Sequence, residues 1–556
     1  MRGVGGADRA EALAGVDVTT PPQCACSMAA LACSVAAVLE DSATVAPGRE
    51  GFMRRLRVLG STGLVVVLVG LGLTACLPAS AGKPGIRVTP ALFPAFDRSV
   101  TDYVNRCDPS KSSGVQVTAI PGDTVSVNGS RPRSGSFNVN VSQQIGQSFT
   151  IAVTSGGVTT THFVRCLPAD FPESSVEKPG APQAAFYLTS LLLGYTAIFD
   201  PNGVPIWWLK GALIVSVLPN KNLAAISRDG MTEYDLNGAP VRKVAVVGNR
   251  NPHDVIMLPN GNYVLGTADL QPCDLSSWDA TFTEPRTCIN HVFEEFTPAG
   301  LLVGSWDTSS HIPVSETTQP WRDEQLSATR DFYDPWHWNS VEFTGDGFLL
   351  SFRHLDAIYK ISSLSSTGSV VWKLGGTTRP ESLTLVNDPL NGVSGQHDAR
   401  WDADGTVTIF DNGTNGLGPS RQPRAVRYAV NTSARTATLV ADVRDSRITS
   451  SSCCGSTRVL PGGNWVNGWG GTTTATENLA EGTRVFGLTV AGQTGRIYRA
   501  IPLLPGQFTA AELRTGMDAQ YSGFGALATT SRNSPESDMA LSCDLGVLFD
   551  DPTQTC

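Results

Sequence analysis

The stretch WHWNSVEFTGDGFLLSFRHLDAIYKISSLSSTGSVVWKL (residues 336–374) defines the repeating unit of this chain. Within it, apolar and polar residues alternate over short runs, and turns that contain glycine, such as Gly345-Asp346-Gly347, separate the runs. Alternation with a period of two is typical of half-buried β-strands, and such turns are typical of hairpins. The stretch therefore predicts an antiparallel unit of four short strands.

Similar units recur on both sides of this stretch. Their clearest turns lie at residues 219–221, 259–261, 402–405 and 461–463. Polar turns with glycine recur at FDPNGVPIWW (199–208), YDLNGAPVRKV (234–244) and FTPAGLLVGSW (296–306). About six units follow Phe186, and a period of about 40 residues with four strands per unit is the signature of a β-propeller. We therefore expect an all-β chain in which residues 183–505 form a six-bladed β-propeller.

Three of these units begin with a histidine: HDVIMLPNGN at His253, HWNSVEFTGDG at His337 and HDARWDADG at His397. In a propeller the first strand of each blade lines the central channel, so residues at the strand starts converge at one mouth. Arg353 ends the second strand of the His337 unit and should reach the same mouth. His354 should point away from it, because neighbouring strand residues face opposite sides of a sheet.

Four long inserts are expected around this mouth. Residues 268–290 and 411–423 are predicted as loops between second and third strands, and residues 306–335 and 375–396 as connections between successive blades. Inserted loops on a rigid scaffold are common places for a site. The histidines and the inserts together predict a functional site at this end of the channel.

The N-terminal region has the pattern of an export signal. Residues 1–52 are alanine-rich and lack periodicity, after which MRRLR (53–57) precedes an apolar core (64–73) and the segment LTAC (73–76). A basic start, a short apolar core and a small-residue cleavage site are typical of a secretory signal. We expect translation to start at Met53 and residues 53–76 to be the signal. An uncleaved membrane anchor is the alternative, although the core is short for a membrane span.

A separate small domain is predicted between the signal and the propeller. Stretches such as VQVTAI, TVSVNGS and SFNVNVS in residues 84–168 have the alternation of short strands, and the segment resembles a cadherin-like β-sandwich with a spacer or docking role. Residues 169–182 are predicted as a proline-rich linker. Residues 506–556 lack the turns of the repeats and are expected to wrap the propeller or trail from it.

Composition and cysteine content narrow the class of protein. Only 16% of residues are charged and the formal net charge is -9, so we expect no nucleic-acid partner.

Eight cysteines follow Cys76, and an even number in an exported chain suggests disulfides. Proximity in the sequence suggests three pairs and leaves it open whether Cys453 and Cys454 bond to each other. The three pairs are Cys107 with Cys166, Cys273 with Cys288, and Cys543 with Cys556.

The segments NPHDVIMLPNGNYVLG, GQHDARWDADGTVTIFDNG and CCGSTRVLPGGNWVNGWGG, together with the stretch from Trp336, resemble the bacterial arylsulfate sulfotransferase family over roughly residues 185–505. The resemblance implies a six-bladed propeller that moves a sulfuryl group from an aryl sulfate donor to a phenolic acceptor, without a nucleotide donor, a metal or another cofactor. It makes His397 the nucleophile that is transiently sulfated. It places His253, His337, Asn339 and Arg353 around the sulfuryl oxygens.

The N-terminal signal carries a second resemblance. The ending LTAC is similar to the lipobox of bacterial lipoproteins, in which the cysteine becomes the acylated first residue. This implies an exported lipoprotein that is anchored to the membrane through Cys76, on its extracytoplasmic face. The sulfotransferase resemblance also admits a homodimer.

The chemistry of sulfuryl transfer suits these residue types. As in phosphoryl transfer, the protein positions an in-line attack and stabilises oxygens that bear negative charge. A guanidinium and imidazoles can donate hydrogen bonds to those oxygens, and a neutral imidazole is a competent nucleophile near pH 7. Either His253 or His337 could carry the proton of the phenol, and the sequence leaves both open.

Other residues near these motifs have structural explanations. Trp336 and Trp338 flank His337 and either stack on an aryl group or pack between blades. Asp254 and Asp398 are expected to form hydrogen bonds between blades, and a hydroxyl of Ser456 or Thr457 could reach the site. Packing roles are expected for Trp207, Trp208, Trp306, Trp372 and Trp401, and surface or packing roles for His162, His291 and His311.

Two alternative functions remain open on the residues alone. Three convergent histidines also match the ligands that zinc or copper prefers, which would make a metal-dependent propeller enzyme. Arg353 argues against it, because a cation beside a metal ion is costly unless an anionic substrate lies between them. The other alternative is a non-catalytic binding propeller at the cell surface, and the presence of all five site residues argues against that.

Overall fold

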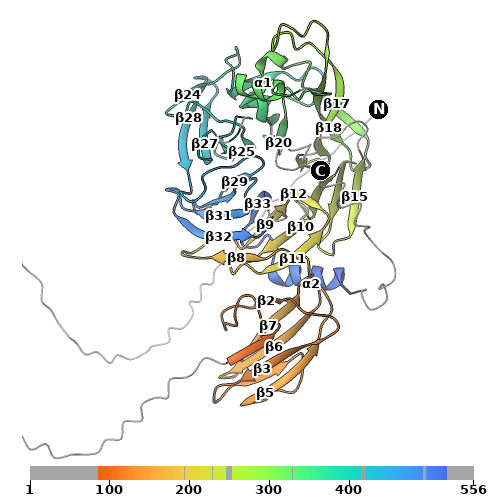
Figure 1. The fold of residues 1–556 in the computed structure, drawn as a ribbon, viewed down its shortest axis with the longest axis vertical. Coiled ribbons are helices and arrows are strands. Elements are labelled where there is room, and N and C mark those ends of the chain that lie inside the picture. Colours follow the sequence, from red (N-terminus) through yellow and green to blue (C-terminus); the bar gives the residue numbers. More distant parts are fainter. Residues whose placement is uncertain are drawn as a thin grey trace, which may run out of the picture. The chain divides into compact units, whose positions relative to one another are not determined.

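A computed structural model describes residues 85–192, 194–227, 230–245, 253–328, 330–415, 418, 420–492 and 496–522 of the protein. The regular secondary structure of the described residues is nearly all β-strand, as predicted, and the sheets are shown in Figure 1. The predicted signal with Cys76, and the predicted pair Cys543 and Cys556, lie outside the described residues. No helix in the described ranges is long and apolar enough to cross a membrane.

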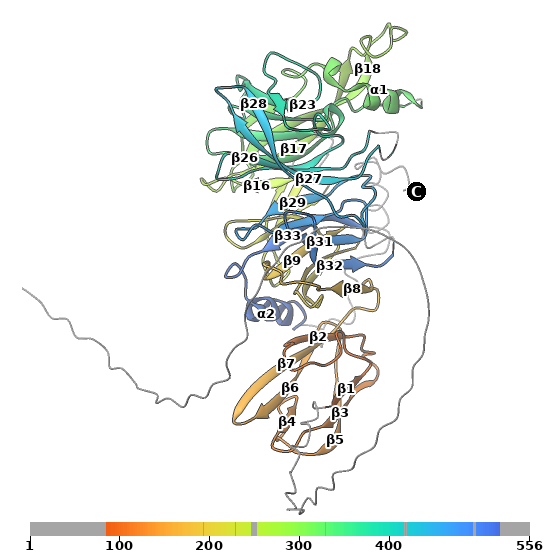
Figure 2. The ribbon, with the colours of Figure 1, turned by 90° about the vertical axis from the view of Figure 1, so that its left-hand side faces the viewer.

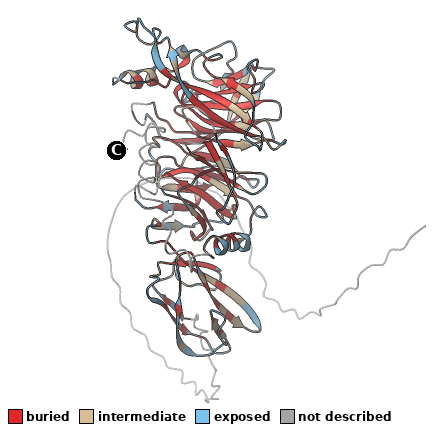
Figure 3. Cartoon of the chain, turned by 90° about the vertical axis from the view of Figure 1, so that its right-hand side faces the viewer, coloured by how far each residue is buried: buried red, intermediate tan, exposed pale blue. Residues whose placement is uncertain are grey.

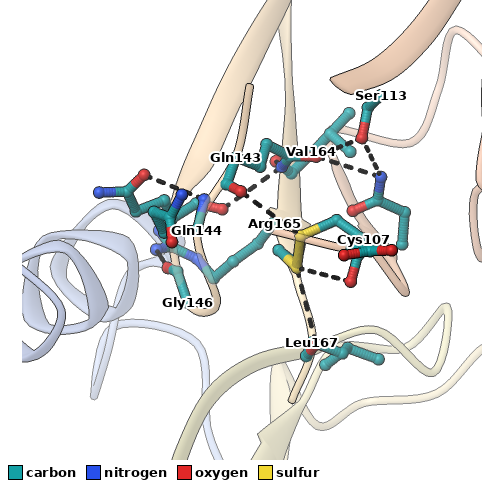
Figure 4. Close-up of a disulfide and its surroundings, with 12 residues drawn as sticks. Cys107, Ser113, Gln143, Gln144, Gly146, Val164, Arg165 and Leu167 are labelled. Atoms are coloured by element: carbon teal, nitrogen blue, oxygen red, sulfur yellow. Dashed lines mark hydrogen bonds between the residues drawn. A yellow bond between two sulfur atoms is a disulfide. The ribbon is translucent and has the colours of Figure 1, made fainter. Parts of the chain in front are cut away.

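The first two sheets lie in residues 85–166 and share one hydrophobic cluster, to which buried valines of both sheets contribute. The Cys107–Cys166 disulfide is present, with the two Cα atoms 5.4 Å apart. Beside it, the Gln143 amide donates to the Val164 carbonyl oxygen (3.1 Å) and accepts from Ser113 (3.0 Å), as Figure 4 shows. The sheets are β1 (Gly85–Thr89), β3 (Ser112–Thr118) and β5 (Ser136–Ser142), and β2 (Asp102–Asn105), β7 (Val158–Cys166), β6 (Ser148–Ser155) and β4 (Thr124–Val127).

Six further sheets of four or five strands follow in the described residues between 174 and 503. The first contains β11 (Pro205–Lys210), β10 (Tyr195–Phe199), β9 (Phe186–Leu191) and β33 (Ile497–Leu503). The second contains β12 (Leu213–Val217), β13 (Leu223–Ser227), β14 (Gly230–Tyr234) and β15 (Pro240–Ala245). The third contains β16 (Val255–Met257), β17 (Tyr263–Cys273), β18 (Arg286–Phe296) and β19 (Leu302–Asp307).

The remaining three sheets continue the same order. The fourth contains β20 (Trp338–Phe343), β21 (Phe348–Phe352), β22 (Ala357–Ile361) and β23 (Val370–Gly375). The fifth contains β25 (His397–Trp401), β26 (Thr406–Asp411), β27 (Arg424–Asn431), β28 (Thr436–Val443) and β24 (Thr384–Val386). The sixth contains β29 (Ser456–Val459), β30 (Trp465–Gly468), β31 (Thr474–Asn478), β32 (Arg484–Val490) and β8 (Ser174–Glu177).

The six sheets close into a ring through their inner strands. Contacts run from β12 to β16, β20, β25, β29 and β33 in turn, and strand β9, paired with β33, contacts β12 again. The inner strand of the first sheet is therefore the late strand β33, not the strand at Phe186 that the repeat count suggested. The first sheet thus joins an early and a late part of the chain, and this pairing closes the ring.

Strand β8 corrects the predicted linker. Residues 174–177 pair antiparallel with β32 at the outer edge of the sixth sheet, and Figure 2 shows the two strands side by side. The prolines on both sides of this short segment led to the prediction of a linker. An edge strand pairs on one side only, so it tolerates nearby prolines that lack a backbone N–H. In the predicted tail, helix α2 (Ala510–Gln520) packs on β11, with Leu513 and Met517 buried in the cluster that fills the first sheet.

The predicted hairpin turns are confirmed, while the inserts contain more structure than expected. Gly261, Gly405 and Gly463 adopt the left-handed φ values that such turns require. The insert at 268–290 extends β17 and β18 and is joined by the predicted Cys273–Cys288 disulfide. The insert at 306–335 contains a 3-10 helix, η1 (Val314–Glu316), and helix α1 (Gln319–Leu326), and the insert at 375–396 contains β24.

A network of buried charges joins the inner strands. The Asp254 carboxylate lies 2.6 Å from Arg499 on β33 and 2.7 Å from Arg400 on β25, and Arg400 lies 2.7 Å from Asp398. All four residues are buried, and Figure 3 shows that buried residues (red) predominate in many strands of the protein. Burial alone would raise the pKa of Asp398, but the guanidinium groups of Arg458, Arg400 and Arg499 hold this pKa below its ordinary value. The predicted role of Asp254 and Asp398 between sheets is confirmed.

We expect Arg499→Met to lower the free energy of unfolding by about 3–5 kcal/mol, because it leaves two buried carboxylates without one of their shared partners. The matched control is Arg427→Met, which breaks partly exposed ion pairs with Asp402 and Asp404 and should cost about 0–1 kcal/mol. Denaturation with guanidinium chloride measures both values. Equal losses in the two variants would contradict the structural importance of the network.

Candidate active site

Three histidines meet where the inner strands β16, β20 and β25 begin. His253 lies two residues before β16, His337 directly precedes β20, and His397 is the first residue of β25. The imidazoles of His253 and His337 lie 5.1 Å apart, at nearly right angles. All three side chains are buried, and His337 is among the charged groups that lower the pKa of His397, so the structure brings together the three histidines at the starts of the inner strands.

Bulges at the starts of two inner strands orient these side chains. The register of β20 shifts between Trp338 and Ser340, and that of β25 shifts between His397 and Arg400. His337 and Asp398 adopt left-handed backbone conformations there, with φ of 47° and 57°. Such conformations are costly for residues with a side chain and cluster at functional sites. At the bulge in β25, the His397 ring contacts Asn412 and the Cys454 amide, while the adjacent Asp398 carboxylate contacts Arg400 in the buried charge network.

His397 is held in one tautomer. Its Nδ1 lies 2.8 Å from the Asn412 side-chain oxygen and 3.1 Å from the Gly395 carbonyl oxygen, so Nδ1 carries the proton. Its Nε2 accepts a hydrogen bond from the Cys454 backbone N–H at 3.1 Å. Burial, together with the nearby positive charge of Arg353, lowers the pKa of His397 well below its ordinary value. The side chain is therefore a neutral imidazole with its lone pair on Nε2.

The Cys454 amide reaches His397 through a left-handed turn. Cys454 and Gly455 have φ of 59° and 100°, and a Cβ on Gly455 would lie 2.3 Å from the Phe410 ring. Cys453 and Cys454 are both buried and are not bonded to each other in the structure. The N–H of Cys454 lies beside the lone pair of His397, where it can also donate to an oxygen of a bound anion.

Arg353 presents unused donors close to His397. The residue opens a short 3-10 helix, η2 (Arg353–Leu355), directly after β21, and its guanidinium lies 4.7 Å from the Trp321 ring of α1. One terminal nitrogen donates to the Ser452 carbonyl oxygen at 2.8 Å. Its buried Nε and Nη1 have no hydrogen-bond partner among the described residues. Buried charged donors without partners are costly, so this pair of N–H groups is suited to an anion.

His354 does not point away from the site as predicted. Because η2 replaces the strand after Phe352, the alternation of strand side chains no longer applies. The His354 ring stacks on His337, with ring centres 4.7 Å apart, and on Trp321 at 4.5 Å. His354 therefore belongs to the same buried cluster as His337.

Asp334 connects the histidines of this cluster. Its carboxylate lies 2.8 Å from His337 Nδ1 and 2.9 Å from His291 Nε2, and its carbonyl oxygen lies 2.6 Å from His354 Nδ1. Burial would raise the pKa of Asp334, but His291 and His337 hold this pKa well below its ordinary value. His291, expected as a surface or packing residue, is thus a buried partner of this carboxylate.

Asn339 lies beside the segment that leads into β25 and His397, whereas the two tryptophans that flank His337 lie in the core. The Asn339 amide donates to the Gln396 carbonyl oxygen at 2.7 Å, and its buried side-chain oxygen has no partner in the described ranges. Trp336 donates to the Ile312 carbonyl oxygen, and Trp338 packs against Phe293. Both indoles are fully buried in one hydrophobic cluster, which supports packing rather than stacking on an aryl group.

Several other predicted residues have structural partners. Ser456 donates to the Ala500 carbonyl oxygen, and Thr457 donates to Asn467, so neither hydroxyl is directed to the site in this structure. Among the tryptophans that were predicted as core, Trp401 is only half-buried. The buried ones are Trp207, Trp208, Trp306 and Trp372. His162 is buried in the N-terminal domain, and His311 stacks on Trp306.

Asp334, His337 and His354 are close enough to be considered as metal ligands, because one ligand atom from each lies within 4.8 Å of the others. However, the Nδ1 atoms of both histidines already bond to Asp334. Arg353 directly precedes His354 and adds a positive charge. The three residues are therefore explained by their mutual hydrogen bonds.

A cavity of about 540 Å³ lies at the other ends of the inner strands. Its lining includes Glu342, Arg400 and Arg458, near the ends of β20, β25 and β29, and none of the histidines of the site. Its charged groups are already paired: Arg400 bonds to Glu342, and Arg458 bonds to Asp398. The cavity therefore does not coincide with the reactive groups.

The cluster at the strand starts combines a neutral imidazole, His397, with buried donors for an anion. A family model described as Arylsulfotransferase (ASST) matches residues 173–495, which is more than half of the chain. The chain belongs to the arylsulfotransferase family. It is accordingly an aryl-sulfate sulfotransferase, and the matched segment contains all of the residues of the cluster.

Other comparisons add names but no further argument about this arylsulfotransferase. No curated protein matches the sequence. Among solved structures, a protein of unknown function from Bacteroides caccae has 11% identity and a TM-score of 0.36, covering 58% of this chain and 99% of its own. Virginiamycin B lyase from Staphylococcus aureus has 10% identity and a TM-score of 0.29, covering 74% of this chain and 100% of its own.

Asn412, Asp334, Trp321 and the Cys454 amide were not singled out from the sequence. Asn412 occurs in FDNG (410–413), where an Asn-Gly pair has the ordinary signature of a turn. Asp334 precedes His337 by three residues, and this spacing is the one local signal that could have indicated the contact. Trp321 and Cys454 lie in connecting segments whose positions only the folded ring determines.

We expect Asn412→Leu to slow turnover of aryl sulfates by on the order of 10²- to 10⁴-fold, as when a buried partner that fixes a catalytic histidine's tautomer is lost. The variant leaves Nδ1 of His397 with only the longer contact to Gly395, so Nε2 can acquire the proton. Asn260→Leu, which removes a hairpin contact with Glu295, is the control and should retain activity. Steady-state rates test both, and an unimpaired Asn412 variant would contradict this role.

Proposed function

We propose that the enzyme transfers a sulfuryl group from an aryl sulfate to a phenol through a covalent intermediate on His397, without a nucleotide sulfate donor. The observation that carries this proposal is the position of Arg353. Its two unpartnered, buried N–H groups and the neutral lone pair of His397 belong to one buried cluster. A sulfate ester presents both a negatively charged group for the arginine and an electrophilic sulfur for the histidine.

The geometry supports a two-step transfer. In the first step, His397 Nε2 attacks sulfur while the bond to the aryl oxygen breaks, and in the second step a phenol oxygen attacks the same sulfur and releases His397. Arg353, Asn339 and the Cys454 amide can interact with the sulfuryl oxygens as their charge changes. A covalent intermediate divides one difficult transfer into two easier ones. The burial of the site limits competition by water.

We also propose that the six sheets are the blades of a six-bladed β-propeller and that residues 84–168 form a cadherin-like sandwich with a spacer role. Support comes from the closed order of contacts between successive sheets and from the shared core of the two N-terminal sheets. On this proposal, the ring brings the starts of β16, β20 and β25 to one mouth. The inserts that contribute Trp321 and Asp334 border the same mouth.

The test uses 4-nitrophenyl sulfate with the purified protein, with and without added phenol, and with no nucleotide present. We expect nitrophenol release that increases with phenol. His397→Ala should lose at least about 10³-fold in rate, as expected when a covalent nucleophile is removed. Mass spectrometry of the protein, mixed with donor alone and quenched at once, should locate one added sulfuryl group on the peptide that contains His397.

The same experiment separates the two alternatives. Activity that is lost on chelation and restored by zinc or copper would indicate the metal-dependent enzyme, for which the proximity of Asp334, His337 and His354 is the supporting observation. Absence of release from a broad panel of aryl sulfates would favour a binding protein. Release without an adduct on His397 would contradict the covalent mechanism while leaving the activity intact.

We further propose that the enzyme is an exported lipoprotein that is anchored through Cys76. The LTAC ending of the signal and the two disulfides of the described domains support export, because disulfides persist in oxidising compartments.

We expect expression in a bacterium to give a membrane-associated protein that incorporates labelled palmitate, because acylation anchors a lipoprotein to its membrane. Cys76→Ala should abolish the label and leave the precursor unprocessed. Cys453→Ala, which changes a cysteine of the folded domain, is the control and should retain the label. Palmitate incorporation into the Cys76 variant would show that the anchor lies elsewhere.

A further inference from the structure

Asp334 lies at the centre of a set of buried imidazoles. Its two carboxylate oxygens bond separately to His291 and His337, and its own backbone N–H donates to the Gln325 side-chain oxygen at 2.9 Å. One carboxylate oxygen also accepts from the backbone N–H of His337 at 2.9 Å. The carboxylate therefore fixes both the backbone and the ring of His337, in spite of the left-handed φ of that residue.

The contact between Asp334 and His337 is the main electrostatic interaction of the His337 ring. The charged and titratable groups that face the ring are Asp334 and His291 from the connecting segments and strands, His354 and Arg353 from η2, His253 before β16, and His397 on β25. Asp334 is the negatively charged member of this set. A carboxylate beside an imidazole favours its protonated form, and a hydrogen bond to Nδ1 directs the other ring nitrogen outward.

We propose that Asp334 is a positioning residue that holds His337 as the proton carrier of the transfer, which rests on the function proposed above. The Nδ1 of His337 is committed to Asp334, so the proton that moves is the one on Nε2. The stacked His354 ring and the perpendicular His253 ring restrict the orientation of this imidazole on two sides. The arrangement thus selects between the two histidines that the sequence left open.

The proton and the electron pairs balance in both steps. When His397 Nε2 forms its bond to sulfur, the bond from sulfur to the aryl oxygen breaks and that oxygen retains the electron pair. The oxygen takes the proton from His337 Nε2, which leaves a phenol, a sulfated His397 and a neutral His337 beside the Asp334 carboxylate. In the second step the acceptor phenol gives its proton to His337 Nε2 as its oxygen attacks sulfur, and the electron pair of the N–S bond returns to His397.

The test compares two donors that differ in their need for a proton. Phenyl sulfate releases a phenolate as basic as that of tyrosine, with a pKa of about 10, whereas 4-nitrophenyl sulfate releases a stabilised phenolate. We expect Asp334→Asn to lower kcat for phenyl sulfate by on the order of 10²-fold and kcat for 4-nitrophenyl sulfate by less than about 10-fold. Asp356→Asn is the matched control, because it changes a buried carboxyl that bonds to Trp321 rather than to His337. Any loss in that control should be equal for the two donors.

Two further measurements distinguish positioning from a merely structural effect. In a double-mutant cycle, adding Asp334→Asn to His337→Gln should cause little further loss with phenyl sulfate, because the two residues act as one unit. The pH above which phenyl sulfate turnover declines should move downward in Asp334→Asn, since an amide no longer favours the protonated ring. Asp334→Glu retains the charge and should restore part of the lost rate. It also provides the donor comparison if the asparagine variant does not fold.

The outcomes separate this inference from the proposed function. Equal losses with the two donors, or additive effects in the cycle, would overturn the role of Asp334 while leaving sulfuryl transfer in place. If the unmodified protein releases no phenol from any aryl sulfate, the proposed function fails and the inference fails with it. Selective loss with phenyl sulfate, together with non-additivity, is the result that supports the inference.

Discussion

The site depends on a buried ionic network that joins three inner strands of the ring. Asp254 and Asp398 each directly follow a histidine of the site, and Arg400 and Arg499 connect these carboxylates across separate sheets. Buried charges are costly unless they are paired, so the strands must keep the register in which the four groups meet. This requirement fixes the backbone positions of the adjacent histidines. The network thus acts on the site without contacting a substrate.

Bulges at the starts of β20 and β25 lie beside two histidines of the site, His337 and His397. His397 and Asp398 are neighbours with different environments, and the register of β25 shifts directly after His397, where Asp398 adopts a left-handed backbone conformation. One residue enters a polar site and the other enters the charge network. The same device at β20 gives His337 a left-handed backbone, which Asp334 holds by bonding to both the amide and the ring.

Opposite charges have separate tasks within the site. Burial lowers the pKa of His397, and the positive charge of Arg353 lowers it further while the arginine offers donors to an anion. Asp334 places a negatively charged carboxylate 2.8 Å from Nδ1 of His337. On the function and the inference proposed above, their partners direct two histidines of the same chemical type to different roles, His397 as the nucleophile and His337 as the proton carrier.

The sequence by itself determined the strand-and-turn repeats, the positions of the three histidines at strand starts, and the two observed disulfides, because alternation, glycine turns and proximity are local signals. Only the tertiary structure decided the partners: Asn412 for His397, Asp334 for His337 and Trp321 for Arg353. These pairs join strands to turns, connections and inserts, and they depend on bulges and on a 3-10 helix that interrupt strand periodicity. The direction predicted for the His354 side chain was wrong for the same reason. Alternation with a period of two holds only while the backbone remains extended, and His354 lies in a 3-10 helix.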